Sequence, residues 1–129
     1  MEKRHLEQAI LWMRASDFIS EESQSESNER FAVATAMAIH AIIKANDALT
    51  IKHLSITARR HDDAISLFKD LVKKNKVNAQ YTHYNQILQD AISLKAKCEY
   101  HGNFISKNDF QIMKRKADKF LKAVMENLK

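Results

Sequence analysis

The chain has 129 residues, of which 29% are charged, with one glycine, no proline and one cysteine. At this length we expect a single domain, residues 1–129, that buries about two-thirds of its unfolded surface. One cysteine cannot form an internal disulfide, one glycine cannot build a glycine-rich phosphate loop, and no apolar run approaches the roughly 18 residues of a membrane span. The N-terminal residues also lack the features of a signal peptide, so we expect a cytoplasmic protein with no membrane association.

Hydrophobic periodicity predicts five helices and no sheet. The first runs from about Glu2 to Ile19, and a polar, acidic connection over residues 20–27 leads to an alanine-rich second helix over residues 28–52. Apolar residues surround much of this second helix, so we expect it at the centre of the domain. After a loop at 54–60, helices are expected at about 61–75 and 78–100, and a capping box formed by Ser106 and Asp109 opens the last helix. The predicted fold is an all-α, up-and-down bundle of five helices.

A strip of polar residues interrupts the apolar surface of the second predicted helix. His40, Lys44 and Asp47 lie on one side of it, within about 60° of one another at 100° per residue. Polar groups on a buried helix must be hydrogen-bonded, lie at an interface, or form a site. We interpret the strip as a satisfied structural network, a contact surface for a dimer or partner, or part of a functional site.

The start of the third predicted helix carries three basic residues in a row, Arg59, Arg60 and His61. Cations beside a helix N-terminus, where backbone N–H groups are free, suit an anion such as phosphate. His61 also falls on the apolar side of its helix, so the alternative is a buried histidine that anchors the preceding loop.

The end of the fourth predicted helix carries further cations. Lys95 points into the apolar arc of its helix, and Lys97 and His101 are four residues apart on adjoining parts of one face. Cations here stabilise a helix C-terminus, which is a purely structural explanation. The functional explanation is that His101 transfers a proton, beside lysines that hold a phosphodiester. Because the sequence has no Cys/His cluster at zinc spacing and only one E-x-x-H pair, at Glu2 and His5, we expect no metal and no cofactor.

Basic residues are concentrated in the later part of the sequence. Residues 1–51 contain five Lys/Arg and eight Asp/Glu, a net charge of −3, whereas residues 52–129 contain sixteen and eight, a net charge of +8. Such an asymmetry predicts a polyanionic partner such as RNA, or an acidic partner protein. The alternative is that the lysine-rich helix faces are simply solvated.

Three patterns in the sequence are similar to those of a known family. They are Ala38-Ile39-His40-Ala41 leading to Asp47-Ala48-Leu49, the pair Arg60-His61, and Tyr100 before the final helix. Together they resemble the HEPN domain (higher eukaryotes and prokaryotes nucleotide-binding) over about residues 5–128, with the segments that follow each pattern adding to the likeness.

The resemblance implies a bundle of four or five helices that commonly dimerises. Many members of the family are metal-independent ribonucleases in toxin–antitoxin, phage-defence and RNA-processing systems, often encoded beside a small nucleotidyltransferase. Those ribonucleases carry an arginine, four to six residues and then a histidine, late in the domain at the dimer cleft. The chain has Lys95, five residues and then His101 at this place. Lysine neutralises a phosphate but lacks the planar fork that grips it bidentately.

These inferences together predict a HEPN-like homodimer of a toxin–antitoxin or defence system. We expect it to bind RNA, a nucleotide or a nucleotidyltransferase partner, and the nucleotide- or RNA-binding candidates are Arg59, Arg60, His61, Lys97 and Tyr100. One alternative is a metal-independent ribonuclease with Lys95 and His101 as the catalytic pair. The other is a protein-binding adaptor that uses the strip of His40, Lys44 and Asp47 as its contact surface.

Overall fold

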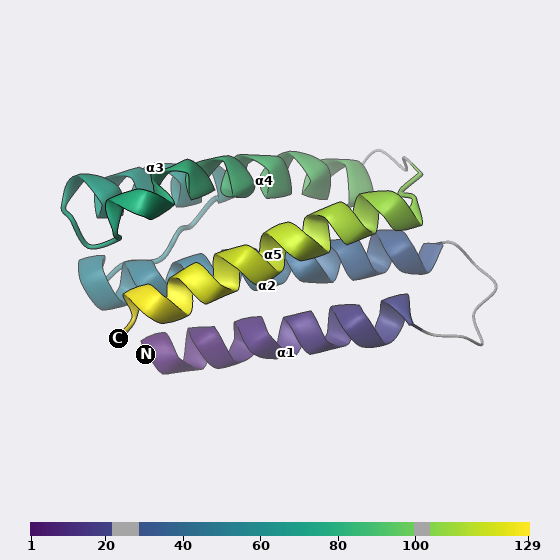
Figure 1. Cartoon of the computed structure of the whole chain (residues 1–129), viewed down its shortest axis with the longest axis horizontal. Helices are drawn as coiled ribbons and strands as arrows, with labels where there is room; N and C mark the ends of the chain where they lie inside the picture. Colours follow the sequence, from purple (N-terminus) through teal and green to yellow (C-terminus); the bar gives the residue numbers. More distant parts are fainter. Residues whose placement is uncertain (22–28, 100–103) are drawn as a thin grey trace.

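The computed structural model describes residues 1–21, 29–99 and 104–129. Within these ranges the chain forms five α-helices and one 3₁₀ helix, and no strand, which confirms the all-α prediction (Figure 1). No helix in the described ranges is both long enough and apolar enough to span a membrane. The elements are α1 (Glu2–Ser20), α2 (Glu29–Leu54), α3 (His61–Lys73), η1 (Ala79–Tyr84), α4 (Asn85–Glu99) and α5 (Lys107–Asn127).

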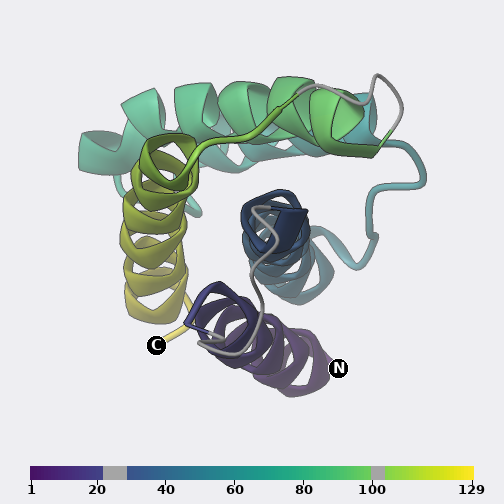
Figure 2. The same cartoon turned by 90° about the vertical axis from the view of Figure 1, so that its right-hand side faces the viewer.

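Helix α2 is central, as its composition predicts. Seen end-on, it lies in the middle, with α1 below it, α5 to one side and α3 and α4 above (Figure 2). It contacts all four of these helices. The neighbouring helices pack closely on five fully buried alanines of α2, because a methyl side chain lets a neighbouring backbone approach. They are Ala34, Ala38, Ala41, Ala45 and Ala48.

Larger apolar side chains from four helices fill the space around α2. The fully buried ones include Ile42 and Leu49 of α2, Leu71 of α3, Leu88 of α4 and Phe120 of α5. One face of α5 buries Phe110, Met113, Ala117, Leu121 and Val124. Phe120 of the same helix packs against the Phe68 ring at a centroid distance of 6.0 Å.

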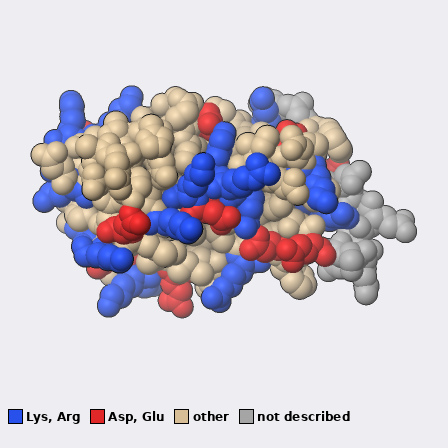
Figure 3. All heavy atoms as spheres, viewed as in Figure 1, with Lys and Arg blue, Asp and Glu red and all other residues tan. Residues whose placement is uncertain are grey.

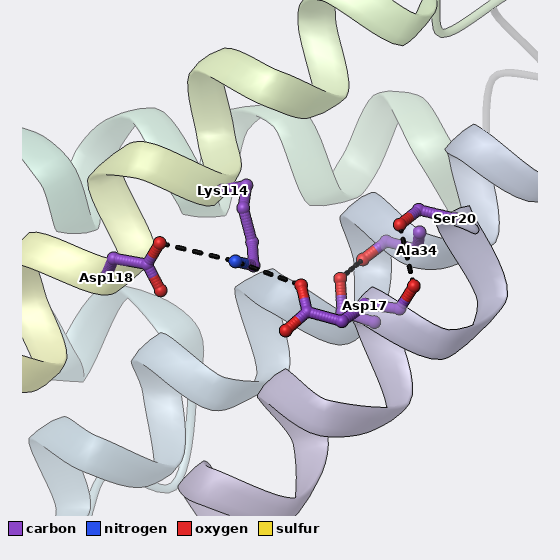
Figure 4. Close-up of polar contacts among 6 residues, drawn as sticks. Asp17, Ser20, Ala34, Lys114 and Asp118 are labelled. Carbon is purple, nitrogen blue, oxygen red and sulfur yellow. Dashed lines mark hydrogen bonds and ion pairs between the residues drawn. The ribbon is translucent and has the colours of Figure 1, made fainter.

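Polar contacts in the C-terminal half of α1 join this helix to α2 and α5 (Figure 4). The buried hydroxyl of Ser16 donates to the backbone carbonyl of Ala34 at 2.7 Å. Lys114 of α5 lies between two carboxylates, 2.9 Å from Asp17 of α1 and 3.3 Å from Asp118 of its own helix. These contacts fix the positions of α1, α2 and α5 relative to one another. The side of α2 that faces away from α5 is left to the segment before α3.

Helix α2 extends to Leu54, slightly beyond the predicted end, and the boundaries of the next two predicted helices also differ from the prediction. Helix α3 ends at Lys73, not Asn75, because Asn75 adopts the left-handed conformation (φ 56°) and the Lys76 N–H bonds back to the Leu71 carbonyl at 2.9 Å. This is a Schellman cap, in which asparagine replaces the usual glycine. The predicted fourth helix begins as 3₁₀, since the Asn78 carbonyl accepts from the Tyr81 N–H at 2.9 Å, and the α-helix starts only at Asn85.

Candidate functional site

Packing of α3 against α4 brings together two residues that the sequence placed in separate candidate sites. The Lys95 ammonium lies 3.2 Å from Nε2 of His61, at the first residue of α3. Lys95 is only 9% exposed, whereas His61 is exposed and therefore is not the buried loop anchor that the sequence also allowed. In this contact the Lys95 ammonium is the donor and Nε2 of His61 the acceptor.

Asp47 of α2 is 7% exposed, and it lies near enough to His61 for the charge of the imidazole to act on its carboxyl group. Burial raises the pKa of its carboxyl group. A hydrogen bond from the backbone of Ala58 and the nearby charges of His5, Lys44 and His61 act in the opposite direction, but burial outweighs them. The segment between α2 and α3 provides the Ala58 contact because it folds back along the side of α2 that no helix covers (Figure 2).

The Asp47 carboxyl group retains an unused acceptor. Its Oδ1 is buried and has no hydrogen-bond partner in the described part of the chain. A buried carboxyl oxygen without a partner is costly, and groups of this kind occur where a ligand or a proton completes the arrangement. We name Asp47, His61 and Lys95 the Asp–His–Lys cluster.

Asn46 sets the distance between α2 and α3 beside this cluster. Its side chain is fully buried, and Nδ2 donates to the Ala64 carbonyl at 3.3 Å. Ala64 lies one turn after His61, so this bond positions the start of α3 against Asp47. Sequence reasoning missed Asn46, although an amide next to an aspartate in an otherwise apolar helix was a usable signal.

The two arginines before α3 stand at the rim of the cluster. Arg59 and Arg60 are both exposed. Arg60 is the N-cap of α3, and its backbone N–H donates to the carboxylate of Asp63 at 3.1 Å. Asp62 and Asp63 in the first turn offset the positive end of the helix. An anion here would therefore be held by the cationic side chains rather than by the helix end.

The polar strip predicted on α2 does not form one exposed surface. His40 stacks on Trp12 of α1, with ring centroids 4.8 Å apart and 23° between the ring planes. Asp47 is buried in the Asp–His–Lys cluster, and half-buried Lys44 lines a pocket against α1. The three residues thus have three different environments.

The candidates at the end of α4 are only partly visible. Tyr100 and His101 lie outside the described residues. Lys97 is exposed and lines a groove of about 250 Å³ between α4 and α5, together with Asp90, Asp109 and Lys116. The ammonium of Lys116 pairs with Asp90 at 2.9 Å across this groove. Basic side chains are frequent over this face, but acidic ones are interspersed among them (Figure 3).

Neither metal chemistry nor a known relative identifies the site. Among the described residues, no group of three or more His, Cys, Asp and Glu side chains is placed to hold a metal ion. No protein-family model matches the sequence, and no curated protein is similar enough to count as a match. The chemistry of the Asp–His–Lys cluster is therefore what carries the functional argument.

Proposed function

We propose that the chain is a HEPN-like module that binds the phosphate group of RNA or of a nucleotide at the Asp–His–Lys cluster. The proposal includes the up-and-down bundle arrangement, a homodimer, and a role in a toxin–antitoxin or defence system with a nucleotidyltransferase-type partner. The all-α fold with α2 at its centre is compatible with such a module.

The observation that carries the proposal is the buried lysine facing an imidazole. Lys95 holds its ammonium 3.2 Å from Nε2 of His61 at a site where little water reaches it. Hydrogen bonds from an ammonium to a phosphate oxygen are charge-assisted, and they are stronger in a place that water reaches poorly. A bound phosphate would accept from the Lys95 ammonium and from an N–H of His61 together.

The state of Asp47 favours the same ligand. Because burial raises the pKa of its carboxyl group, this residue repels a phosphate less than an ordinary aspartate would. In its protonated form the carboxyl group also donates a hydrogen bond, which a phosphate oxygen accepts. Arg59 and Arg60 at the rim add cations that attract the ligand from solution.

The test is the substitution Lys95→Met, with binding of a labelled RNA oligonucleotide measured by fluorescence anisotropy at low salt. Losing one charge-assisted contact costs about 1.5–3 kcal/mol, so we expect roughly 10- to 100-fold weaker binding. Lys69→Met, at an exposed position of α3, removes the same charge and is expected to have little effect. Folding of both variants is checked by circular dichroism, and methionine keeps an unbranched side chain at this buried position. Equal affinity of Lys95→Met and the wild type would reject the proposed site.

The His61–Lys95 contact also favours a second candidate function, metal-independent RNA cleavage. A neutral His61 would accept the 2′-hydroxyl proton while the 2′-oxygen attacks phosphorus, and Lys95 would stabilise the charge on the phosphoryl oxygens. The 5′-oxygen would leave with a proton from an acid, for which the family resemblance implies His101. Cleavage in EDTA that yields a cyclic phosphate and is lost in both His61→Ala and His101→Ala would support this function. If His61→Ala or His101→Ala still cleaves RNA, the substituted histidine has no part in the mechanism.

A further inference from the structure

A groove between α1 and α5 takes no part in the proposed phosphate site. In Figure 1, α5 runs in front of α2 and alongside α1. The groove has a volume of about 350 Å³. Four residues of each helix line it: Ile10, Met13, Arg14 and Asp17 of α1, and Asp118, Leu121, Lys122 and Met125 of α5. Each set covers about two helical turns, so the groove is about 10 Å long at 1.5 Å per residue.

The floor of this groove is apolar and adaptable. It includes two methionines, the buried Met13 and the exposed Met125, whose unbranched side chains adjust to the shape of a partner. Leu11 and Phe18 lie about one turn before and one turn after Arg14, so the three share one face of α1. Leu11 is 52% exposed and Phe18 is 68% exposed. The apolar surface therefore continues from the groove onto the outer side of α1, as at sites of protein interaction.

The charged residues at the groove carry a net positive charge. Asp17 and Asp118 share one ammonium, that of Lys114, at 2.9 Å and 3.3 Å. Arg14 of α1 and Lys122 of α5 are exposed, and neither forms a salt bridge within the described ranges. Three cations thus accompany two carboxylates, and each side of the groove presents a cation to which acidic groups of a partner are complementary.

We propose that this groove binds an amphipathic helix of a partner protein, with acidic residues along both borders of the apolar strip of that helix. Such a helix places apolar anchors at i, i+3 or i+4 and i+7, and this spacing matches the two turns of the groove. The anchors would pack on Met13 and Met125, and the acidic borders would face Arg14 and Lys122. The inference is independent of the proposed phosphate site, since no residue of the Asp–His–Lys cluster lines the groove.

The test follows the methionine methyl groups by NMR, with two synthetic peptides as probes. A groove of this length makes a small interface, typical of weak and transient complexes, which NMR detects. Both peptides form a helix with a leucine strip, bordered by glutamate in one and by lysine in the other. The glutamate-bordered peptide is expected to shift the signals of Met13 and Met125 and to leave those of Met1 and Met37, which do not line the groove. Substitution of each methionine by leucine assigns the signals.

Charge reversal then tests the orientation of the peptide in the groove. In Arg14→Glu/Lys122→Glu the glutamate-bordered peptide should bind roughly tenfold more weakly than to the wild type, because two attractions become two repulsions. The lysine-bordered peptide should become the preferred one. The control Arg4→Glu/Lys119→Glu makes the same change in net charge at exposed positions of the same two helices and should keep the preference of the wild type. Circular dichroism checks that both variants are folded.

Three results would overturn the inference. The first is that the signals of Met13 and Met125 stay in place up to millimolar glutamate-bordered peptide. The second is that the control loses affinity as much as Arg14→Glu/Lys122→Glu, which would mean that net charge and not the groove attracts the peptide. The third is that both signals move when the protein alone is concentrated, which would make a second copy of this chain the occupant.

Discussion

Replacing Asp47 by asparagine tests whether burial controls the charge of the cluster. Asn has nearly the same shape, still offers an oxygen to the Ala58 backbone, and cannot ionise. Asp47 is 7% exposed, and burial raises the pKa of its carboxyl group in spite of the Ala58 hydrogen bond and the neighbouring cations. The folded protein therefore binds this proton more tightly than the unfolded chain does.

The sign and size of the effect follow from proton linkage. Between about pH 4 and the raised pKa of Asp47, the folded state holds more protons than the unfolded state, so the free energy of unfolding falls as pH rises. Each unit of difference between the pKa of Asp47 in the folded state and in the unfolded state changes the free energy of unfolding by about 1.4 kcal/mol. The opposing contacts of the carboxylate reduce the net effect, and we expect Asp47→Asn to be more stable than the wild type at about pH 7 and to lose this advantage below about pH 4, where Asp47 is protonated in both states.

The assay is urea unfolding followed by far-UV circular dichroism over a series of pH values, in the wild type, in Asp47→Asn and in Glu7→Gln. Glu7 is exposed on α1, so its substitution makes the same change in net charge without relieving burial. The difference in free energy of unfolding should grow with pH for Asp47→Asn and stay small for Glu7→Gln. If Asp47→Asn is less stable than the wild type at neutral pH, the carboxylate is held by ion pairs and the reasoning is refuted.

Two further predictions concern the contacts that hold the helices. Ser16→Ala should lower the free energy of unfolding by about 1 kcal/mol, since the buried hydroxyl of Ser16 bonds to the Ala34 carbonyl between α1 and α2; the more exposed Ser20→Ala should cost less, and chemical denaturation of both compares them. Asp109→Asn should destabilise the protein at neutral pH but not in strong acid, because hydrogen bonds from the backbone and hydroxyl of Ser106 lower the pKa of the Asp109 carboxyl group. That stability is present above the unfolded pKa and is lost as pH falls through the folded one, so pH-dependent thermal melts that show a constant difference would contradict it.

Local features of the chain were predictable from the sequence because they depend on residues a few positions apart. Apolar residues at helical spacing located five helices, and the alanines of residues 28–52 identified the central one. The box formed by Ser106 and Asp109 was found at the start of α5, where each backbone N–H bonds to the other side chain at 3.0 Å. The Schellman cap at Asn75 was missed, since asparagine signals a left-handed residue less clearly than glycine.

The composition of the candidate site depended on the tertiary structure. His61 and Lys95 are 34 positions apart, and no local pattern relates them until α3 and α4 pack with their facing sides together. The buried state of Asp47 requires residues 55–60 to return along α2, a path that no periodicity encodes. Helical periodicity reports which side of a helix is apolar, whereas packing and loop direction decide which polar groups from different helices meet. For that reason the sequence predicted the individual candidates, and only the fold grouped Asp47, His61 and Lys95 into one site.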